Sequence, residues 1–123
     1  MAKSVNDSVL DGALNVVKTN AVTMTACSAE PTTRTEAITT YMLASVTITS
    51  TDYTGPANGD VSGRKLTVNA QNGVSVTNSG TATHVALCDG TNLLYVTTCT
   101  SQELTSGNTV NFPAWKIEIA DPT

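Results

Sequence analysis

The amino-acid sequence predicts a mainly β protein: an antiparallel β-sandwich of about seven short strands with one helix at its N-terminus. The chain has 123 residues, which is the size of a single domain spanning residues 1–123. Hydrophobic residues make up 40% of the chain and aromatic residues only 4%, and threonine is the most abundant type. Valine and threonine have stiff side chains that suit a pleated surface. Short alternating stretches separated by Gly- and Asn-containing turns are typical of a sandwich or barrel.

The N-terminal segment SVNDSVLDGALNVVKTN has the period of a helix. Asn6 or Asp7 can cap its start, Lys18 lies in the last turn, and Asn20 suits the stop. We expect a helix over about residues 6–19, packed on one side of the sandwich, because so short a helix is marginal alone. The apolar positions that follow helical spacing are Val5, Val9, Leu10, Ala13, Leu14 and Val17.

The sandwich is expected over about residues 21–120, where the apolar period changes to two. The predicted strands lie in AVTMTACSAEP, ASVTITS, RKLTVNA, VSVT, THVALC, LLYVTTC and VNFPAWKIEIA. Pro113 indicates a bulge or an edge position within the last of these. A slip of one residue in the register would replace Leu94 and Val96 in the core by Leu93 and Tyr95. The expected core residues are Val46, Ile48, Leu66, Val68, Val85, Leu87, Leu94 and Val96.

Three connections bear on function. TTRTEAITTYML, residues 32–43, is either a helical turn or a surface loop. TDYTGPANGDVSG, residues 51–63, is a long polar connection rich in Gly and Asn, and long polar loops often carry function. DGTN, residues 89–92, has the chemistry of a tight turn.

Cys27, Cys88 and Cys99 form an odd set, which argues against a closed framework of disulfides within one chain. The favoured interpretation is three thiols that act as small hydrophobic side chains; disulfides, including intersubunit ones, are the alternative. A hairpin turn centred on Gly90 and Thr91 places Cys88 opposite Leu93 and Cys99 opposite Ala82, too far apart to bridge. Any disulfide is therefore expected to join subunits or to link Cys27 to a neighbouring strand.

No group of residues in the sequence predicts catalysis. His84 is the single histidine, so no cluster of histidines can bind a metal, and a structural role is expected for it. The carboxylates are scattered, DGTN lacks the further oxygen ligands of a calcium loop, and no segment ends as a phosphate-binding loop does. We therefore predict a protein that is not an enzyme and has no catalytic, metal or cofactor-binding residue.

Charge and hydropathy exclude two classes of partner. The formal net charge is −4 and the isoelectric point about 4.6, and Arg64 and Lys65 are the only adjacent basic pair. This is too little positive charge for a nucleic-acid groove. No apolar run approaches the roughly 20 residues of a membrane span, and the first residues lack the apolar segment of a signal peptide. We expect synthesis in a cytoplasm and no contact with a membrane.

The order of these elements resembles that of small virion proteins of tailed bacteriophages, the tail-fibre and head-associated proteins. The similarity covers most of the chain and is sharpest from Gly80 to Ile119. The matching pieces are Thr-His-Val-Ala-Leu, Asp-Gly, Leu-Leu-Tyr, Gly-Asn-Thr-Val and Phe-Pro-Ala. The chain departs from that family at Met24 and Ala26, where an aromatic pair is usual. The resemblance implies a β-sandwich and a virion setting, and no catalytic residue.

The expected function is that of a bacteriophage virion structural protein, made in the host bacterium and located in the virion. A compact acidic chain without repeats or coiled coil favours a capsid decoration (cement) subunit that stabilises the head; the alternatives are a tail, neck or fibre-associated module and a carbohydrate-binding or enzymatic domain. The expected partners are the major capsid protein or neck and tail proteins, and further copies in a homo-oligomer. Besides the connection Thr51 to Gly63, the expected contact residues are Asn6, Asp7, Asp11, Asn15 and Lys18 on the polar side of the helix.

Overall fold

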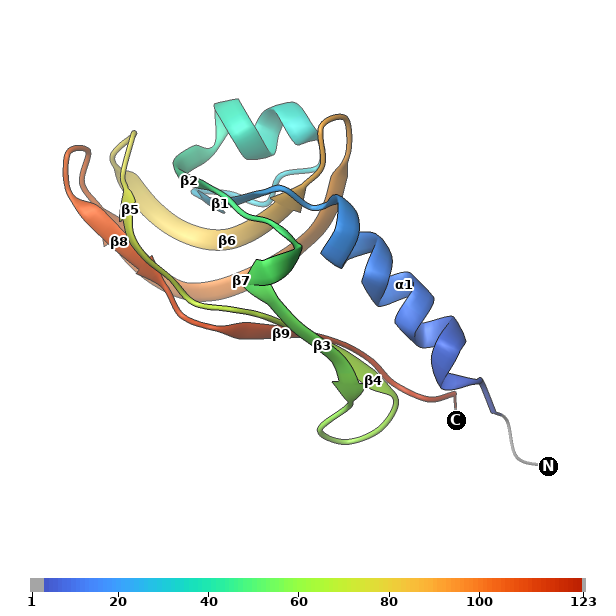
Figure 1. Cartoon of the computed structure of the whole chain (residues 1–123). Helices are drawn as coiled ribbons and strands as arrows, with labels where there is room; N and C mark the ends of the chain where they lie inside the picture. Colours follow the sequence, from blue (N-terminus) through green and yellow to red (C-terminus); the bar gives the residue numbers. More distant parts are fainter. Residues whose placement is uncertain (1–3, 123) are drawn as a thin grey trace.

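The computed structural model describes residues 4–122 and confirms the predicted fold class. It is mainly β, with 49% strand, antiparallel sheets and one N-terminal helix, and the arrangement is sandwich-like (Figure 1). The strand and helix bounds are α1 Asp7–Asn20, β1 Thr23–Cys27, β2 Met42–Thr47, β3 Tyr53–Asn58, β4 Arg64–Val68, β5 Gln71–Ser75, β6 Gly80–Cys88, β7 Leu93–Leu104, β8 Thr109–Phe112 and β9 Trp115–Ile119, with a π-helical turn at Glu36–Thr40 and a 3-10 turn at Ser50–Asp52.

One layer is a four-stranded antiparallel sheet in the order β2-β1-β6-β7. The long β6–β7 hairpin curves across the molecule (Figure 1). The other layer consists of β3-β4-β9 and the pair β5-β8. Val68 lies opposite Trp115 and Gln71 opposite Phe112, so the two strand pairs are in register with each other across Pro113; farther along, the β5–β8 register shifts between Gln71 and Val74. Proline lacks the amide donor that the ladder needs, which explains the interruption there.

The core lies between these layers and contains most of the residues expected there. Ile48, Leu66, Val68, Val85 and Leu87 are buried, and Val46 and Leu94 pack against them from half-buried positions. The prediction for Val96 is wrong, because Val96 lies opposite Ala86 and Tyr95 lies opposite Leu87. A bulge at the Leu87–Cys88 end of the hairpin adds one residue to β7 and turns Tyr95, rather than Val96, toward the main core.

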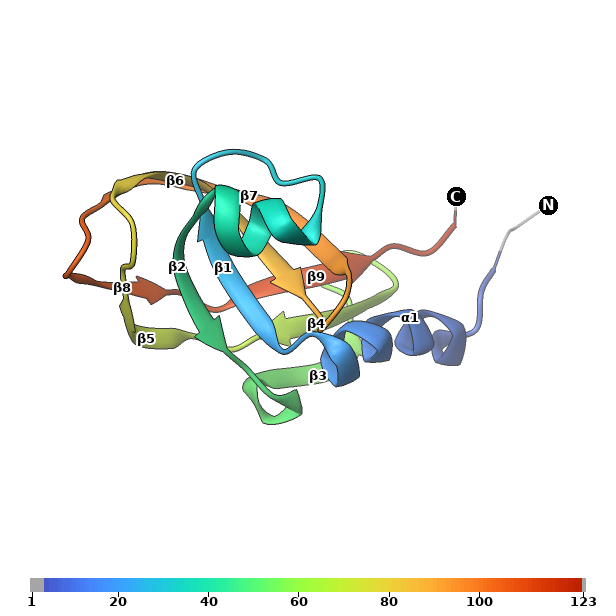
Figure 2. The same ribbon diagram turned by 90° about the horizontal axis from the view of Figure 1, so that it is seen from above.

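Helix α1 begins at the expected cap and packs on β3 and β4, where Leu10 and Leu14 are buried. The Asn6 side chain accepts a hydrogen bond from the Ser8 backbone amide at 2.8 Å. Arg64 of β4 forms an ion pair with Asp11, with 2.7 Å between Nε and Oδ1. Figure 2 shows α1 beside β3 and β4, at the end of the molecule that also holds the described C-terminal residues.

A second, smaller core lies on the other face of the four-stranded sheet. Cys27, Ala86 and Cys88 are buried there beneath Ala37 of the helical turn. The segment 32–43, which the sequence left open between a turn and a loop, therefore forms a helical turn that covers this face. Its last amide, that of Tyr41, donates to the carbonyl of Glu36 at 2.8 Å.

The described residues form nine strands, where about seven were expected. Two differences account for this. The predicted last strand is split into β8 and β9 at Pro113, and the connection Thr51 to Gly63 contains β3. In β3, Gly55 and Pro56 occupy an irregular position between Thr54 and Ala57, where the register shifts. Gly and Pro are uncommon in strand interiors, and for this reason the sequence pattern does not predict β3.

Candidate protein-binding surfaces

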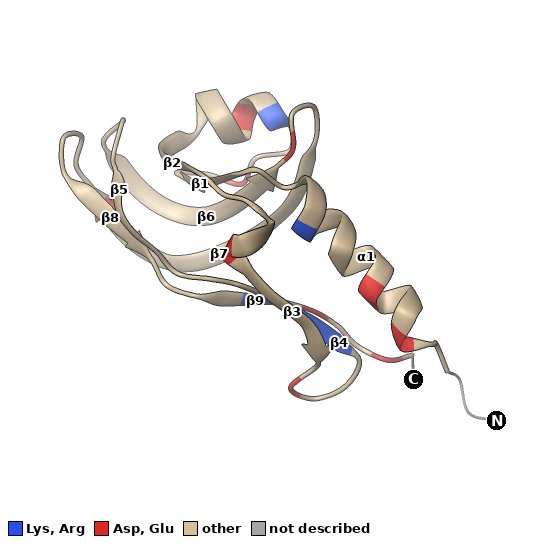
Figure 3. Ribbon diagram, in the orientation of Figure 1, with Lys and Arg blue, Asp and Glu red and all other residues tan. Residues whose placement is uncertain are grey.

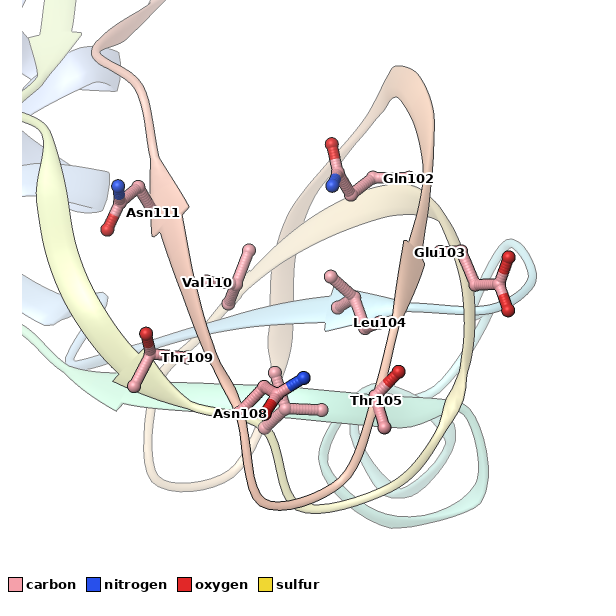
Figure 4. A pocket seen from close by; sticks show the side chains of 9 residues that line it. Gln102, Glu103, Leu104, Thr105, Asn108, Thr109, Val110 and Asn111 are labelled. Atoms are coloured by element: carbon pink, nitrogen blue, oxygen red, sulfur yellow. The ribbon is translucent and has the colours of Figure 1, made fainter.

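Strands β7 and β8 follow each other in sequence but do not pair. They are joined by a tight turn in which the Asn108 amide donates to the Thr105 carbonyl at 3.1 Å. Beyond the turn, and as far as residues 4–122 are concerned, β7 pairs with β6 alone and β8 with β5 alone. In Figure 4 the two arms diverge from the turn and leave a space between them. Within residues 4–122 the facing edges of both strands therefore lack a hydrogen-bonded neighbour, and we call the space between them the seam.

The seam is a groove that reaches the main core. Three adjoining pockets of about 440, 230 and 330 Å³ follow it from the turn toward Trp115. Gln102, Leu104, Val110 and Asn111 line both the first and the second pocket. The second and third share a further set, and the second is lined in addition by the core residues Ala26 and Ala82. That shared set is Val85, Cys99, Thr100, Phe112 and Pro113.

The walls of the seam are polar but almost uncharged. Between Gln71 and Phe112 only Asp89 and Glu103 carry a charge, and Figure 3 shows these strands with little colour. In Figure 4 the Gln102, Leu104 and Val110 side chains point into the space, whereas Glu103 points away from it. The groove therefore offers backbone hydrogen bonds and apolar side chains, and very little electrostatic attraction.

A wide bulge places Cys99 at the seam. His84 lies opposite Thr98 and Ala82 opposite Gln102, so three residues of β7 face the single residue Thr83. The prediction that Cys99 lies opposite Ala82 is therefore wrong, although Cys88 lies opposite Leu93 as expected. Residues 98–103 are all exposed. The sequence held one sign of this, because TTCTSQE has no apolar residue at alternate positions and so no face to bury.

Helix α1 exposes a second surface, an apolar stripe, where the sequence predicts contacts only through polar residues of the helix. Val9 is 62% exposed and Val16 is 52% exposed. Gly12 and Ala13 lie between them at helical spacing, both exposed, and a Cβ atom added at Gly12 would meet nothing within 4 Å. We call Val9, Gly12, Ala13 and Val16 the outer stripe. Exposed apolar groups that gather on one helix face are typical of protein-binding surfaces.

The polar helix residues predicted as contacts divide into two groups. Asp11 and Lys18 are engaged within the chain, because Asp11 pairs with Arg64 and the Lys18 ammonium donates to the Gly55 carbonyl at 2.8 Å. A helix this short has to be anchored to the sheet by its polar as well as its apolar groups. A contact of Asp11 or Lys18 with another protein stays a prediction. Asn6 is the helix cap. Asp7 and Asn15 are exposed and remain predicted contact residues.

The connection Thr51 to Gly63 is largely ordered by its own hydrogen bonds. After β3, Asp60 accepts hydrogen bonds from Lys116 at 2.7 Å and from Lys65 at 2.6 Å. These two lysines lower the pKa of the Asp60 carboxyl to about 2. The Asp60 backbone amide also donates to the Glu118 carboxylate. These contacts join the loop to β4 and β9 and restrain it.

The cysteines are free, and their surroundings differ. Cys27 and Cys88 are buried, and burial raises the pKa of both thiols. This agrees with the interpretation of thiols as small hydrophobic side chains. Cys99 is the exposed one of the three. No bond joins Cys88 to Cys99, and Cys27 is not linked to a neighbouring strand.

The described part of the chain brings together no catalytic or metal-binding group. His84 is hydrogen-bonded through Nδ1 to the hydroxyl of its neighbour Thr83 at 2.8 Å. The Asp89 carboxylate accepts hydrogen bonds from the backbone amides of Thr91 and Asn92, so it stabilises the turn and does not form an ion site. Within residues 4–122 no three His, Cys, Asp or Glu side chains are grouped so that they could hold a metal ion.

Comparison with protein-family models, with curated proteins and with solved structures finds no match to this chain. Over residues 4–122, no helix combines the length and the hydropathy that crossing a membrane requires. The two surfaces described above, the seam and the outer stripe, are therefore the features on which a function has to be built.

Proposed function

We propose that the protein is a non-enzymatic structural subunit of a bacteriophage virion, and specifically a decoration subunit that binds the major capsid protein on the outside of the head. Support for the virion setting comes from the resemblance of Gly80 to Ile119 to head- and tail-associated phage proteins. Support for a binding role comes from the molecule itself. The observation that carries it is the outer stripe of α1.

The outer stripe is suited to a protein surface for three reasons. Its two valines are more than half exposed, so burial against a partner would remove apolar area from water at about 25 cal/mol per Å². Its centre is Gly12 and Ala13, which let another backbone approach closely. Its polar neighbours on the helix, Ser8, Asn15 and Thr19, are uncharged and impose no repulsion on a partner.

The binding role is tested with depleted particles, which are produced by a phage whose gene for this protein has been disrupted and therefore lack the protein. The purified protein is added to these particles. We expect unmodified protein to bind and to raise the temperature at which the genome is released, because a ligand that binds only the assembled shell stabilises it by mass action. Val9→Asp combined with Val16→Asp should weaken binding at least about tenfold, since a buried unpaired carboxylate is costly. Asn72→Asp, at an exposed position of β5 that belongs neither to the outer stripe nor to the predicted contact residues, is the matched control and should bind as wild type does.

The number of copies per particle tests the location. A decoration subunit should be present in copy numbers proportional to those of the capsid protein when intact particles are quantified by mass spectrometry. A count of a few copies per particle, or binding that is unaffected by the two aspartates, would replace this proposal by that of a tail, neck or fibre-associated module.

A further inference from the structure

The seam between β7 and β8 has the form of a sheet from which one strand is missing. We propose that it receives an extended segment of another virion protein, which adds a strand between β7 and β8. This inference rests on the proposed function, because it names the manner in which the subunit engages a virion partner. It concerns a different surface from the outer stripe, and it can fail separately.

The backbone gives the first argument. Among the described residues β7 pairs only with β6 and β8 only with β5, so two strand edges with free amides and carbonyls face one groove. Proteins usually protect such edges with lysine, proline, a bulge or a covering element, and of these β7 has the bulge opposite Thr83. The β7 sequence LLYVTTCTSQEL contains no lysine, arginine or proline and carries a single charge, at Glu103. An extended peptide can satisfy these backbone groups by strand addition.

The floor of the groove gives the second argument and defines the partner. Leu104, Val110, Phe112 and Val85 line it, and successive side chains of an added strand would point alternately to this floor and to solvent. The bound segment should therefore alternate apolar and polar residues. Seven residues of β7 line the groove, and the stretch from Thr97 to Leu104 that contains them corresponds to roughly 26 Å of extended chain at about 3.3 Å per residue.

A second copy of this chain is a poorer occupant. Every strand between residues 4 and 122 already pairs with at least one neighbour in its own sheet, so a second copy offers no strand with both edges free to pair with β7 and β8 together. The edges that face the seam are also interrupted, β7 by the bulge opposite Thr83 and the other side by Pro113. A bulged edge resists regular pairing with its own symmetry copy, whereas a separate flexible segment can follow its course.

Cys99 provides the measurement, because it lines the seam and is the exposed thiol of the three. We expect a maleimide to react with Cys99 at least about tenfold more slowly in the assembled particle than in the free protein, and prior modification of Cys99 should weaken binding to depleted particles by a similar factor. Thr91→Cys supplies an internal control, since its thiol lies in the turn at the other end of β7 and should keep its reactivity in the particle.

Hydrogen–deuterium exchange distinguishes an added strand from a side chain that merely covers the groove. Amides in residues 97–104 and 109–112 should exchange more slowly in the particle than in the free protein. Equal reactivity of Cys99 in both states, or protection of the thiol without slower exchange of these amides, would overturn the inference while the proposed function stands.

Cys99–Cys99 disulfides between subunits in particles would show a second copy in the seam and would also overturn the inference. If unmodified protein fails to bind particles at all, the proposed function is wrong and this inference falls with it.

Discussion

The rings of Tyr95 and Trp115 stack, with their centroids 5.8 Å apart and their planes inclined by 26°. The two residues belong to β7 and β9, which lie in different sheets and are not hydrogen-bonded neighbours. Trp115 also lines the last pocket of the seam. The stack therefore holds the two layers together at the end of the seam where their backbones make no ladder.

Replacement of Trp115 tests this arrangement. Trp115→Ala removes the stack and leaves a cavity, and we expect the free energy of unfolding to fall by about 3 kcal/mol. Trp115→Phe keeps a ring for Tyr95 and also removes the indole Nε1, a buried donor without a hydrogen-bond partner in the described structure, so a loss of about 1 kcal/mol is expected. Chemical denaturation followed by circular dichroism gives both values; equal losses would mean that the stack contributes nothing.

The ion pair between Asp11 and Arg64 should contribute to the docking of α1. The Arg64 side chain is 18% exposed and that of Asp11 27%, and Nη2 of the guanidinium also donates to the second carboxylate oxygen at 3.3 Å. We expect Asp11→Ala to lower the free energy of unfolding by about 1 kcal/mol. Asn15→Ala, on the exposed side of the same helix, should change it by less than about 0.5 kcal/mol. The two variants would lose the same amount if Asp11 were the free surface residue that its sequence position suggested.

Tyr53 should make the protein sensitive to alkaline pH. Its hydroxyl donates to the Ala21 carbonyl at 3.2 Å, and burial, with a smaller effect of Asp52, raises the pKa of Tyr53 to about 12. The unfolded chain ionises its tyrosines near pH 10. The contribution of Tyr53 to stability is therefore complete below about pH 10 and is lost as the pH rises toward 12. In urea titrations, Tyr53→Phe should be less stable by about 1 kcal/mol at neutral pH and should lose less stability above pH 10.

Asp60 should stay ionised at unusually low pH. Lys116 and Lys65 hydrogen-bond its carboxylate and lower its pKa to about 2 in the folded state, below the value near 3.9 expected when unfolded. This stabilising effect is present above pH 4 and disappears as the pH falls through 2. Carboxyl chemical shifts followed by NMR between pH 5 and pH 1.5 measure the titration directly. In Lys116→Met the midpoint should move upward, and an unchanged midpoint would rule out the lysine as its cause.

The exposed thiol of Cys99 should react with thiol reagents in the native protein, whereas the buried thiols of Cys27 and Cys88 should not. Native protein at pH 8.5 is expected to react with one equivalent of a thiol reagent, at Cys99, and denatured protein with three. Peptide mapping after alkylation identifies the site. Rapid labelling of Cys27 or Cys88 in the native state would show that the helical turn over the second core opens, and would contradict the burial of both residues.

Local pattern was a reliable guide wherever one side of an element is buried. The helix was expected at about residues 6–19 and is found at Asp7–Asn20, with Asn6 as its cap. The alternation of Leu66 with Val68 and of Val85 with Leu87 predicted their burial correctly. These are short-range signals, since the periods of 3.6 and 2 follow from the geometry of the elements themselves. The same logic failed at Val96, where a bulge that no period reveals shifts the register by one residue.

The candidate surfaces depend on the tertiary structure. Polarity is the basis for expecting Asp11 and Lys18 at a contact surface, yet both face the sheet and pair there, while the apolar residues Val9 and Val16 face outward. A helical period shows which residues share a face of the helix, but the packing of the helix on the sheet decides which of these faces is buried. The seam likewise exists because β7 and β8 separate after the turn at Thr105 to pair with different strands.

The sequence alone therefore determined the fold class, the helix, the core-facing residues of the regular strands and the turn between β6 and β7, because each depends on the chemistry of neighbours along the chain. Only the tertiary structure decided which strand edges remain unpaired, which thiol is exposed and which side of α1 is free. Those features depend on contacts between segments far apart in sequence, such as Arg64 with Asp11 and Tyr95 with Trp115, whose pairing no local pattern encodes.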